Sequence, residues 1–258
     1  MAAPRNSRPG MLLDPSAPIN QGLVAWWPMW EGAGGKCLDI SGKNNHGTLT
    51  NGPMWKDGLQ FDGTNDYVST PIGALTNFVG AGGPNSYAIE VETAVVTRQC
   101  ILADYNTAGS TTSALVEFGG YLQPDDQLSI NIGGPNYISL GTYVVNRKYS
   151  IVASYTGTNL SGYLDGIFKV SAATSFAPSG DNGLAFGRAG NYNGLYLNGR
   201  IMSVRIWKRA LSALEVQQLY VNPNIGLWTP DYTRYYVAAA GGADVRKKII
   251  SAYMRIAA

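Results

Sequence analysis

Two carboxylates with a spacing suited to acid–base chemistry lie in one predicted strand. Glu90 and Glu92 flank Val91, so both side chains would project from the same face of the strand. Paired carboxylates of this kind carry out glycoside hydrolysis. No third acid accompanies the pair, and a solvated strand face is the simpler interpretation. We therefore predict that the chain is not an enzyme, and we keep a glycoside hydrolase that uses Glu90 and Glu92 as a third alternative.

Oxygen-bearing side chains in two loops have the chemistry that calcium prefers. Asp39 and Asn44 lie in the first loop, and Asp62, Asn65 and Asp66 lie in the second. Calcium binds carboxylate, amide and carbonyl oxygens. The candidate ligands are therefore Asp39, Asn44, Asp62 and Asp66, with Asp39 first. The alternative is that both loops are Asx turns, in which the side chain accepts hydrogen bonds from its own backbone. Calcium is the one cofactor that the sequence suggests.

Aromatic and amide side chains in loops form a third group of candidates. Tyrosine rings can stack on sugar rings, and amide or guanidinium groups can bind the hydroxyls at the edge of the sugar. The candidate glycan-binding residues are Tyr105, Asn106, Asn136, Tyr137, Arg188, Tyr192 and Asn193. The alternative is that these are ordinary surface residues of a tyrosine-rich protein and bind nothing. The single histidine, His46, is expected to hold the loop at residues 39–47 by hydrogen bonds.

Composition indicates strands and turns that would carry these residues. The 258 residues are 45% hydrophobic and 14% charged, with 32 glycines and 16 tyrosines. The net charge of +2, without a basic stretch interleaved with aromatics, argues against a nucleic-acid partner. No apolar run is long enough to cross a bilayer, so no membrane insertion is expected. Cys37 and Cys100 form either one disulfide or two buried free thiols.

The chain alternates short apolar segments with glycine, proline and asparagine turns. Residues 22–30 predict a first core strand, and residues 87–96 predict a strand with one solvated face. Asp165-Gly166 predicts a tight turn between two further strands. Near the end, residues 199–220 predict a strand, a turn and a short helix. At the start of that helix we expect Ser212 to cap the amide of Glu215 and the Glu215 side chain to reach back to Ser212. Leu211 would pack on Val216, and Asn222-Pro223 would end the helix.

Four ordered motifs resemble one family, the laminin-G-like, concanavalin A-like jelly-roll domains. They are GLVAWWP at 22–28, DISGKNNHGTL at 39–49, GLQFDGTNDYV at 58–68 and NGRIMSVRIWKRALSALEVQQLY at 198–220. The resemblance implies an all-β fold, a two-sheet antiparallel jelly-roll sandwich with one short helix after the last core strand and extended terminal arms. Related domains often hold calcium in loops. Met202-Ser203 replaces an acidic residue that often follows GRI in the family, which counts against calcium here.

The ends of the chain depart from the family pattern. We predict an extended N-terminal arm at 1–20, the jelly-roll domain at 21–223, and a C-terminal arm at 224–258 with a short amphipathic helix. That helix would need a protein surface to pack on. The candidate assembly residues in the two arms are Arg5, Arg8, Trp228, Tyr232, Ile249 and Tyr253.

The arms and the absence of an apolar signal-peptide core lead to a functional hypothesis. The chain is predicted to be a virion accessory protein of a bacteriophage: a capsid decoration, head-fibre or tail-associated subunit on the virion surface. Its partners would be other virion proteins, further copies of itself and host surface glycans. The alternative is a carbohydrate-binding lectin module of a bacterial surface or secreted protein.

Overall fold

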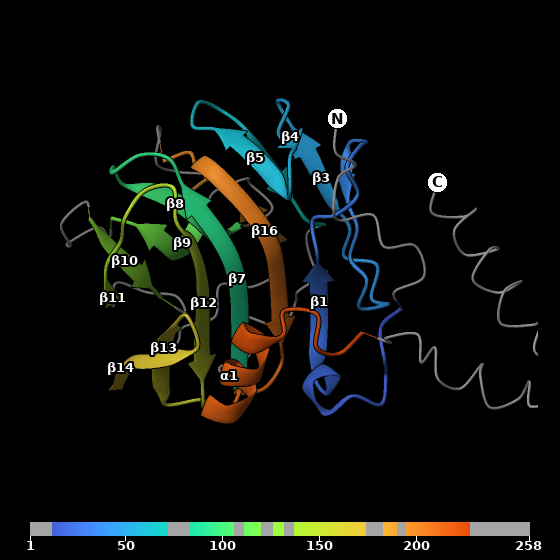
Figure 1. The fold of residues 1–258 in the computed structure, drawn as a ribbon, viewed down its shortest axis with the longest axis vertical. Helices are drawn as coiled ribbons and strands as arrows, with labels where there is room; N and C mark the ends of the chain where they lie inside the picture. The colour runs from blue at the N-terminus through green and yellow to red at the C-terminus, as the bar shows by residue number, and fades with distance from the viewer. Residues whose placement is uncertain are drawn as a thin grey trace, which may run out of the picture.

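The computed structural model describes residues 12–71, 83–105, 111–119, 126–131, 137–173, 183–189 and 195–227. Within them the chain forms two antiparallel sheets of eight strands each, packed face to face, with one α-helix on the outside of one sheet (Figure 1). This architecture confirms the predicted all-β jelly-roll sandwich with one short helix after the last core strand. Among the described residues, no helix has the length and apolar character needed to span a bilayer.

The sheet that carries the helix is called the back sheet. Its strands are, in spatial order, β14 (Ile167–Ala173), β13 (Asn159–Leu164), β12 (Lys148–Tyr155), β7 (Asn85–Thr93), β16 (Asn198–Trp207), β5 (Leu59–Asp62) and β4 (Met54–Trp55). The long strand β16 pairs along one edge with β7. Along its other edge it pairs first with β5 and then with β1 (Leu23–Trp27).

The opposite sheet is called the front sheet. Its strands are, in spatial order, β11 (Ile138–Thr142), β10 (Gln127–Ile130), β9 (Thr111–Phe118), β8 (Gln99–Tyr105), β15 (Gly183–Phe186), β6 (Tyr67–Ser69), β3 (Gly47–Thr50) and β2 (Lys36–Cys37).

The core lies between the two sheets and follows the alternation of the strands. In β7, Tyr87, Ile89 and Val91 are buried in the core, as the period of two requires. Trp27 of the back sheet meets Phe186 of the front sheet edge to face, with ring centroids 4.9 Å apart. Such contacts join the sheets, because each aromatic ring buries a large apolar area.

The helix α1 (Ala213–Val221) begins and ends where the sequence predicts. The Ser212 hydroxyl accepts from the Glu215 amide at 3.3 Å, and the Glu215 carboxylate accepts from the Ser212 amide at 2.9 Å. Leu211 and Val216 belong to one buried cluster, and Asn222 is the C-cap. The cluster also includes side chains of β12 and β16, so α1 covers the outer face of the back sheet.

Arg205 of β16 holds the segment that follows the helix. Its guanidinium stacks 3.5 Å above the ring of Trp26 and donates to the carbonyl oxygens of Pro223 and Ile225. The side chain is buried, and this desolvation lowers the pKa of Arg205 to about 9. The strand therefore fixes the path of the chain at residues 223–225.

The described parts of the two terminal segments lie side by side. The indole of Trp207 donates to the carbonyl of Ile19 at 2.7 Å, in the short 3₁₀ helix η1 (Pro18–Asn20). Leu13 and Leu227 form an antiparallel bridge. The arms predicted at 1–20 and 224–258 remain predictions. Ile19 and Leu227 belong to the buried cluster on the outer face of the back sheet, and Leu13, Ala17 and Ile225 pack against it. All the candidate assembly residues lie outside the described residues.

Two smaller predictions are also decided by the structure. Asp165 and Gly166 both have positive φ, 53° and 75°, which is the tight turn expected between β13 and β14. Cys37 and Cys100 are both buried free thiols, so the disulfide alternative is wrong. Burial raises the pKa of each thiol well above its ordinary value.

Candidate functional site

The face of the front sheet that points away from the core carries a row of polar side chains. Glu117 lies between Val116 and Phe118, which are both in the core, so its side chain projects to the other face. The register places Glu117 opposite Cys100 of β8 and opposite Ser129 of β10. We call Glu117 and Ser129 the polar row; Cys100 beside them packs with Ala103 and Ala189.

Arg98 precedes β8 and binds the carboxylate of the polar row. Its Nη2 lies 3.1 Å from both Oε1 and Oε2 of Glu117, and its Nε lies 3.2 Å from Oε2. The Glu117 side chain is fully buried, whereas that of Arg98 is 21% exposed. Burial raises the pKa of Glu117, and the charge of Arg98 acts against this rise. The carboxylate thus holds a guanidinium in one fixed orientation, with part of it open to solvent.

Tyr137 and Arg188, both candidates from the sequence, lie on this same side of the front sheet. Burial raises the pKa of Tyr137, the negative charge of Glu117 raises it further, and the Asn131 side chain is hydrogen-bonded to it. The Arg188 guanidinium lies 3.7 Å from the ring centroid of Tyr67 on β6. Val68, the next residue, points into the core, so the Tyr67 ring is on the outer face.

Among the described residues, two buried polar atoms on this face have no hydrogen-bond partner. They are the Ser129 hydroxyl oxygen and Nε of Arg188. Buried polar atoms are nearly always paired, and each exception needs an explanation. The site that we call the front-face site comprises Arg98, Glu117, Ser129 and Tyr137, with Arg188 stacked on Tyr67.

The sequence found this site only in part. Of its predicted glycan-binding residues, Tyr137 and Arg188 are in the site and Tyr105 is the last residue of β8. The other four, Asn106, Asn136, Tyr192 and Asn193, lie outside the described residues. Arg98, Glu117, Ser129 and Tyr67 were missed. The signal for Glu117 was present, because a lone acid between two core positions of a strand must face the other side.

Asp39, the first calcium candidate, has its carboxylate oxygens engaged by protein donors. Oδ1 accepts from the amides of Trp26 and Ser41, both at 2.9 Å. Oδ2 accepts from the Ser41 hydroxyl at 2.8 Å and from the Asn45 amide at 3.0 Å. As expected, His46 holds the same loop, accepting the Asp39 amide proton at Nδ1 over 3.0 Å. This geometry fits the Asx-turn alternative and leaves little capacity for an ion.

The second candidate loop has the same local character. Asp62 accepts from the Thr64 amide at 2.8 Å, and Asp66 accepts from the Asp62 amide at 3.1 Å. Asn44 of the first loop has a positive φ of 60° and is exposed. Within the described ranges, no group of three or more histidine, cysteine or acidic side chains is placed to hold a metal ion. Calcium therefore stays a prediction.

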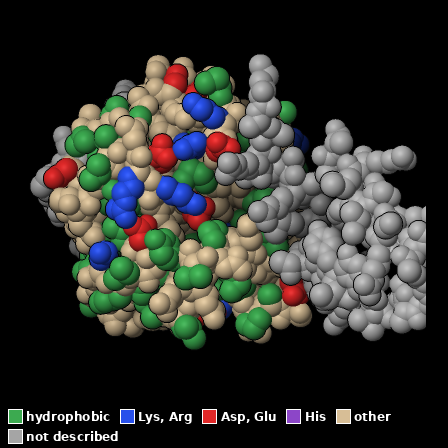
Figure 2. Space-filling model, in the orientation of Figure 1, with side chains coloured by type: hydrophobic (Ala, Val, Ile, Leu, Met, Phe, Trp, Pro, Cys, Tyr) green, Lys and Arg blue, Asp and Glu red, His purple; other side chains and the backbone are tan. Residues whose placement is uncertain are grey.

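Glu90 and Glu92 lie on the outer face of the back sheet, where both are ion-paired. Nζ of Lys148 is 2.7 Å from Oε2 of Glu90, and Nη2 of Arg200 is 2.9 Å from Oε2 of Glu92. Figure 2 shows this face with acidic and basic side chains interspersed. Each carboxylate has a cation on a neighbouring strand, as on a solvated sheet face.

Known proteins of the same fold are similar to this chain. A family model described as the concanavalin A-like lectin/glucanases superfamily matches residues 62–217. A Trypanosoma rangeli sialidase in complex with sialic acid is similar at 15% identity and a TM-score of 0.63, over 80% of this chain and 33% of that chain. A search of curated proteins finds none that matches.

Two further solved structures match over a larger share of their own length. Domain 4 of AbnA, a GH43 extracellular arabinanase from Geobacillus stearothermophilus, in complex with arabinotriose, has 16% identity and a TM-score of 0.59. The match covers 77% of this chain and 98% of that domain. The binding domain of botulinum neurotoxin serotype D has 13% identity and a TM-score of 0.57, over 78% and 52% of the two chains.

These comparisons correct the prediction that the chain is not an enzyme. Chains that share this fold include a sialidase and a domain of an arabinanase, so the prediction is contradicted. The identities of 15% and 16% show the fold alone and assign no activity. This chain spans about a third of the length of the sialidase.

Proposed function

We propose that this chain, which belongs to the concanavalin A-like lectin/glucanase superfamily, binds carbohydrate at the front-face site. Among the functions predicted from the sequence, this is the lectin alternative. We favour it over a virion role because the described residues of the front-face site combine a buried carboxylate–guanidinium pair, aromatic rings and unpaired polar atoms, which suits a sugar. A saccharide presents many hydroxyl groups, and each can donate and accept hydrogen bonds.

The observation that carries the proposal is the unfilled hydrogen-bonding capacity of the front-face site. Ser129 Oγ and Arg188 Nε are buried and have no hydrogen-bond partner in the part of the chain that the structure describes, and leaving a buried polar atom unpaired costs about 1–3 kcal/mol. A saccharide hydroxyl that reached either atom would remove that cost, and Arg98, whose side chain is 21% exposed, is open to solvent in the same site. The guanidinium of Arg98 adds a positive charge that Glu117 holds in one orientation, so little side-chain entropy is lost on binding.

The aromatic rings of the same site fit this ligand class. Tyr67 and Tyr137 are partly buried; Tyr137 offers a limited apolar surface beside charged donors, whereas one face of the Tyr67 ring is taken by Arg188. Arg188 covers the Tyr67 ring and holds it in place. The AbnA domain gives independent support, because it matches over nearly its whole length and its structure was solved with arabinotriose.

The experiment is glycan binding by the full-length chain, first on a glycan array that includes arabinotriose and then by calorimetry on the best probe. Arg188→Gln should weaken binding at least tenfold, because hydrogen bonds from charged groups contribute about 1.5–3 kcal/mol. Tyr137→Ala should also weaken it. Lys208→Gln removes an exposed cation away from the site and should bind like the wild type. An array without signal, or unchanged binding by both site variants, would refute the proposal.

The virion role stays a second proposal, and so do the predicted virion partners and the predicted location on the virion surface. It rests on the arms at the two ends. Light scattering of the full chain beside a form trimmed to 20–225 tests it: assembly of the full chain alone supports the role, and two monomers count against it.

A further inference from the structure

We propose a second binding site, for a saccharide that carries a carboxylate, in the hollow between the β13–β14 turn and helix α1. The proposal takes its ligand class from the proposed function and is otherwise independent of the front-face site. It rests on the shape of the hollow, on an exposed tyrosine at its wall, and on an imbalance of charge among the lining side chains.

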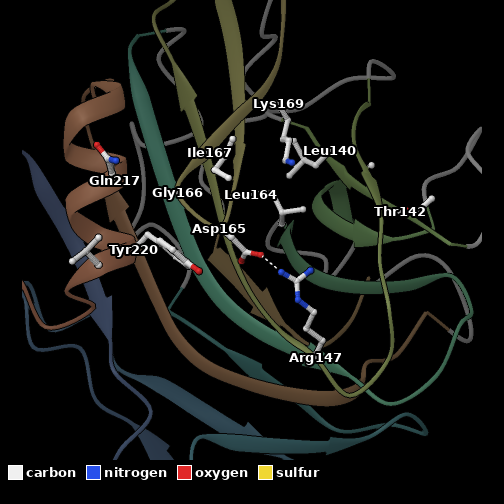
Figure 3. A pocket seen from close by; sticks show the side chains of 12 residues that line it. Leu140, Thr142, Arg147, Leu164, Asp165, Gly166, Ile167, Lys169, Gln217 and Tyr220 are labelled. Atoms are coloured by element: carbon white, nitrogen blue, oxygen red, sulfur yellow. Dashed lines mark hydrogen bonds and ion pairs between the residues drawn. The ribbon is translucent and has the colours of Figure 1, made fainter.

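The hollow is large enough for a small ligand. Its volume is about 680 Å³, within the range of roughly 300–1,000 Å³ that is common for ligand sites. One wall is formed by Gln217, Tyr220 and Val221 of α1, and the far side includes Leu140 and Lys169 (Figure 3). A second hollow of about 450 Å³ is lined by three of the same residues, Arg147, Asp165 and Tyr220. The two hollows share these walls, so an oligosaccharide could extend from one into the other.

Tyr220 supplies an aromatic surface whose position is fixed by the turn. A Cβ atom added to Gly166 would lie 2.9 Å from Cβ of Tyr220, so only glycine allows the side chain to pack there. The tyrosine is nevertheless 47% exposed. Gln217 lies three residues earlier, on the same side of the helix, and can bind hydroxyl groups beside the ring. A ring next to polar groups suits a sugar better than a purely apolar ligand.

The charges in the hollow do not balance. Asp165 accepts from Nη2 of Arg147 at 2.5 Å and from the Ser150 amide at 3.0 Å, so its carboxylate is already satisfied. Arg147 keeps a side-chain exposure of 54%. Lys169 is exposed and forms no ion pair with any described residue.

Arg147 and Lys169 face the same space. Figure 3 shows the two cations on either side of Leu164, with Tyr220 across the turn. The lining therefore carries two cations and one anion, which leaves one positive charge without a counterpart. A carboxylate on the ligand would supply the missing negative charge, and the Arg147 guanidinium can bind such a group in a defined geometry. A neutral saccharide would use the ring and Gln217 and could accept a hydrogen bond from Lys169, but it would supply no counter-charge.

The test compares acidic saccharides with their neutral counterparts on the full-length chain. The probes are oligosaccharides of galacturonate, glucuronate and sialic acid, each beside a matched neutral oligosaccharide, with acetate and inorganic phosphate as small anions. At least one acidic probe should bind at least tenfold more tightly than its neutral partner. This preference should shrink between about 50 mM and about 500 mM salt, because exposed charges are screened.

Variants locate the binding. Lys169→Met and Tyr220→Ala should each weaken binding of the acidic probe at least tenfold. Lys43 is an exposed lysine outside the hollow, so Lys43→Met should leave this binding unchanged. Tyr137→Ala on the front sheet should leave acidic binding intact, so failure of one site can be told from failure of the other. The proposal is overturned if no acidic probe is preferred, if acetate or phosphate binds as tightly, or if Lys169→Met has no effect.

Discussion

Gly199→Ala should damage the centre of the back sheet. Gly199 lies in β16 opposite Thr93 of β7 and Phe61 of β5, so neighbouring strands confine it on both sides. A Cβ atom at this position would lie 2.2 Å from the carbonyl oxygen of Glu92 and 2.9 Å from Cα of Thr93. Both are backbone atoms and cannot rotate away. The two strands would have to separate by roughly 0.8 Å to reach an allowed contact.

The expected loss follows from two costs. Inserting a methyl group into a closely packed site costs about 1–3 kcal/mol. Separating the strands also weakens ladder hydrogen bonds, each of which contributes about 1 kcal/mol. The free energy of unfolding should therefore fall by about 3 kcal/mol. For a domain of this size, that corresponds to a Tm lower by roughly 6–12 °C.

The assay is thermal unfolding followed by circular dichroism, with urea unfolding as a second measure. Gly35→Ala is the matched control, because a Cβ at Gly35 would meet no atom within 4 Å. It should change the free energy of unfolding by no more than about 0.5 kcal/mol. If Gly199→Ala and Gly35→Ala have the same Tm, the close approach of β16 and β7 does not limit this position, and the steric argument is refuted.

Two further predictions concern the helix and the front-face site. Ser212→Ala should lower the free energy of unfolding by about 1 kcal/mol, because it removes the cap of α1. Leu214→Ala, at an exposed position of the same helix, should lower it by less, and equal losses in urea unfolding would contradict this. Burial raises the pKa of Glu117, so the folded state holds this proton more tightly than the unfolded chain. Its contribution to stability should therefore rise as the pH falls through the raised pKa, and should be complete below the ordinary value of 4.5. Comparing urea unfolding of the wild type and Glu117→Gln from about pH 7 to about pH 4 isolates this contribution; parallel pH profiles would show that Glu117 does not titrate as argued.

Local features were the most predictable from the sequence. The capping box of Ser212 and Glu215 needs only residues three apart, and the turn at Asp165-Gly166 needs only two adjacent residues. The strand alternation that defines the core face of β7 is equally local, because it depends only on the period of two. Four ordered motifs then sufficed to indicate the family and the fold.

Carboxylates were harder to interpret, because their role depends on which groups surround them. The sequence offered Asp39 as a calcium ligand or an Asx turn, and only the folded loop shows its oxygens engaged by Trp26, Ser41 and Asn45. It also singled out Glu90 and Glu92, whose cations come from other strands. Spacing along the chain gave the candidates, but the partners decide their chemistry.

The sequence by itself determined the strands, the helix and its cap, and through its motifs the jelly-roll sandwich. Only the tertiary structure placed Glu117 against Arg98, Arg188 over Tyr67, and Tyr220 across from Lys169. The physical reason is that turns and caps are set by bonds between near neighbours. Sites on this sandwich instead arise where strand register brings distant residues together, and that register is fixed only when both sheets close on the common core.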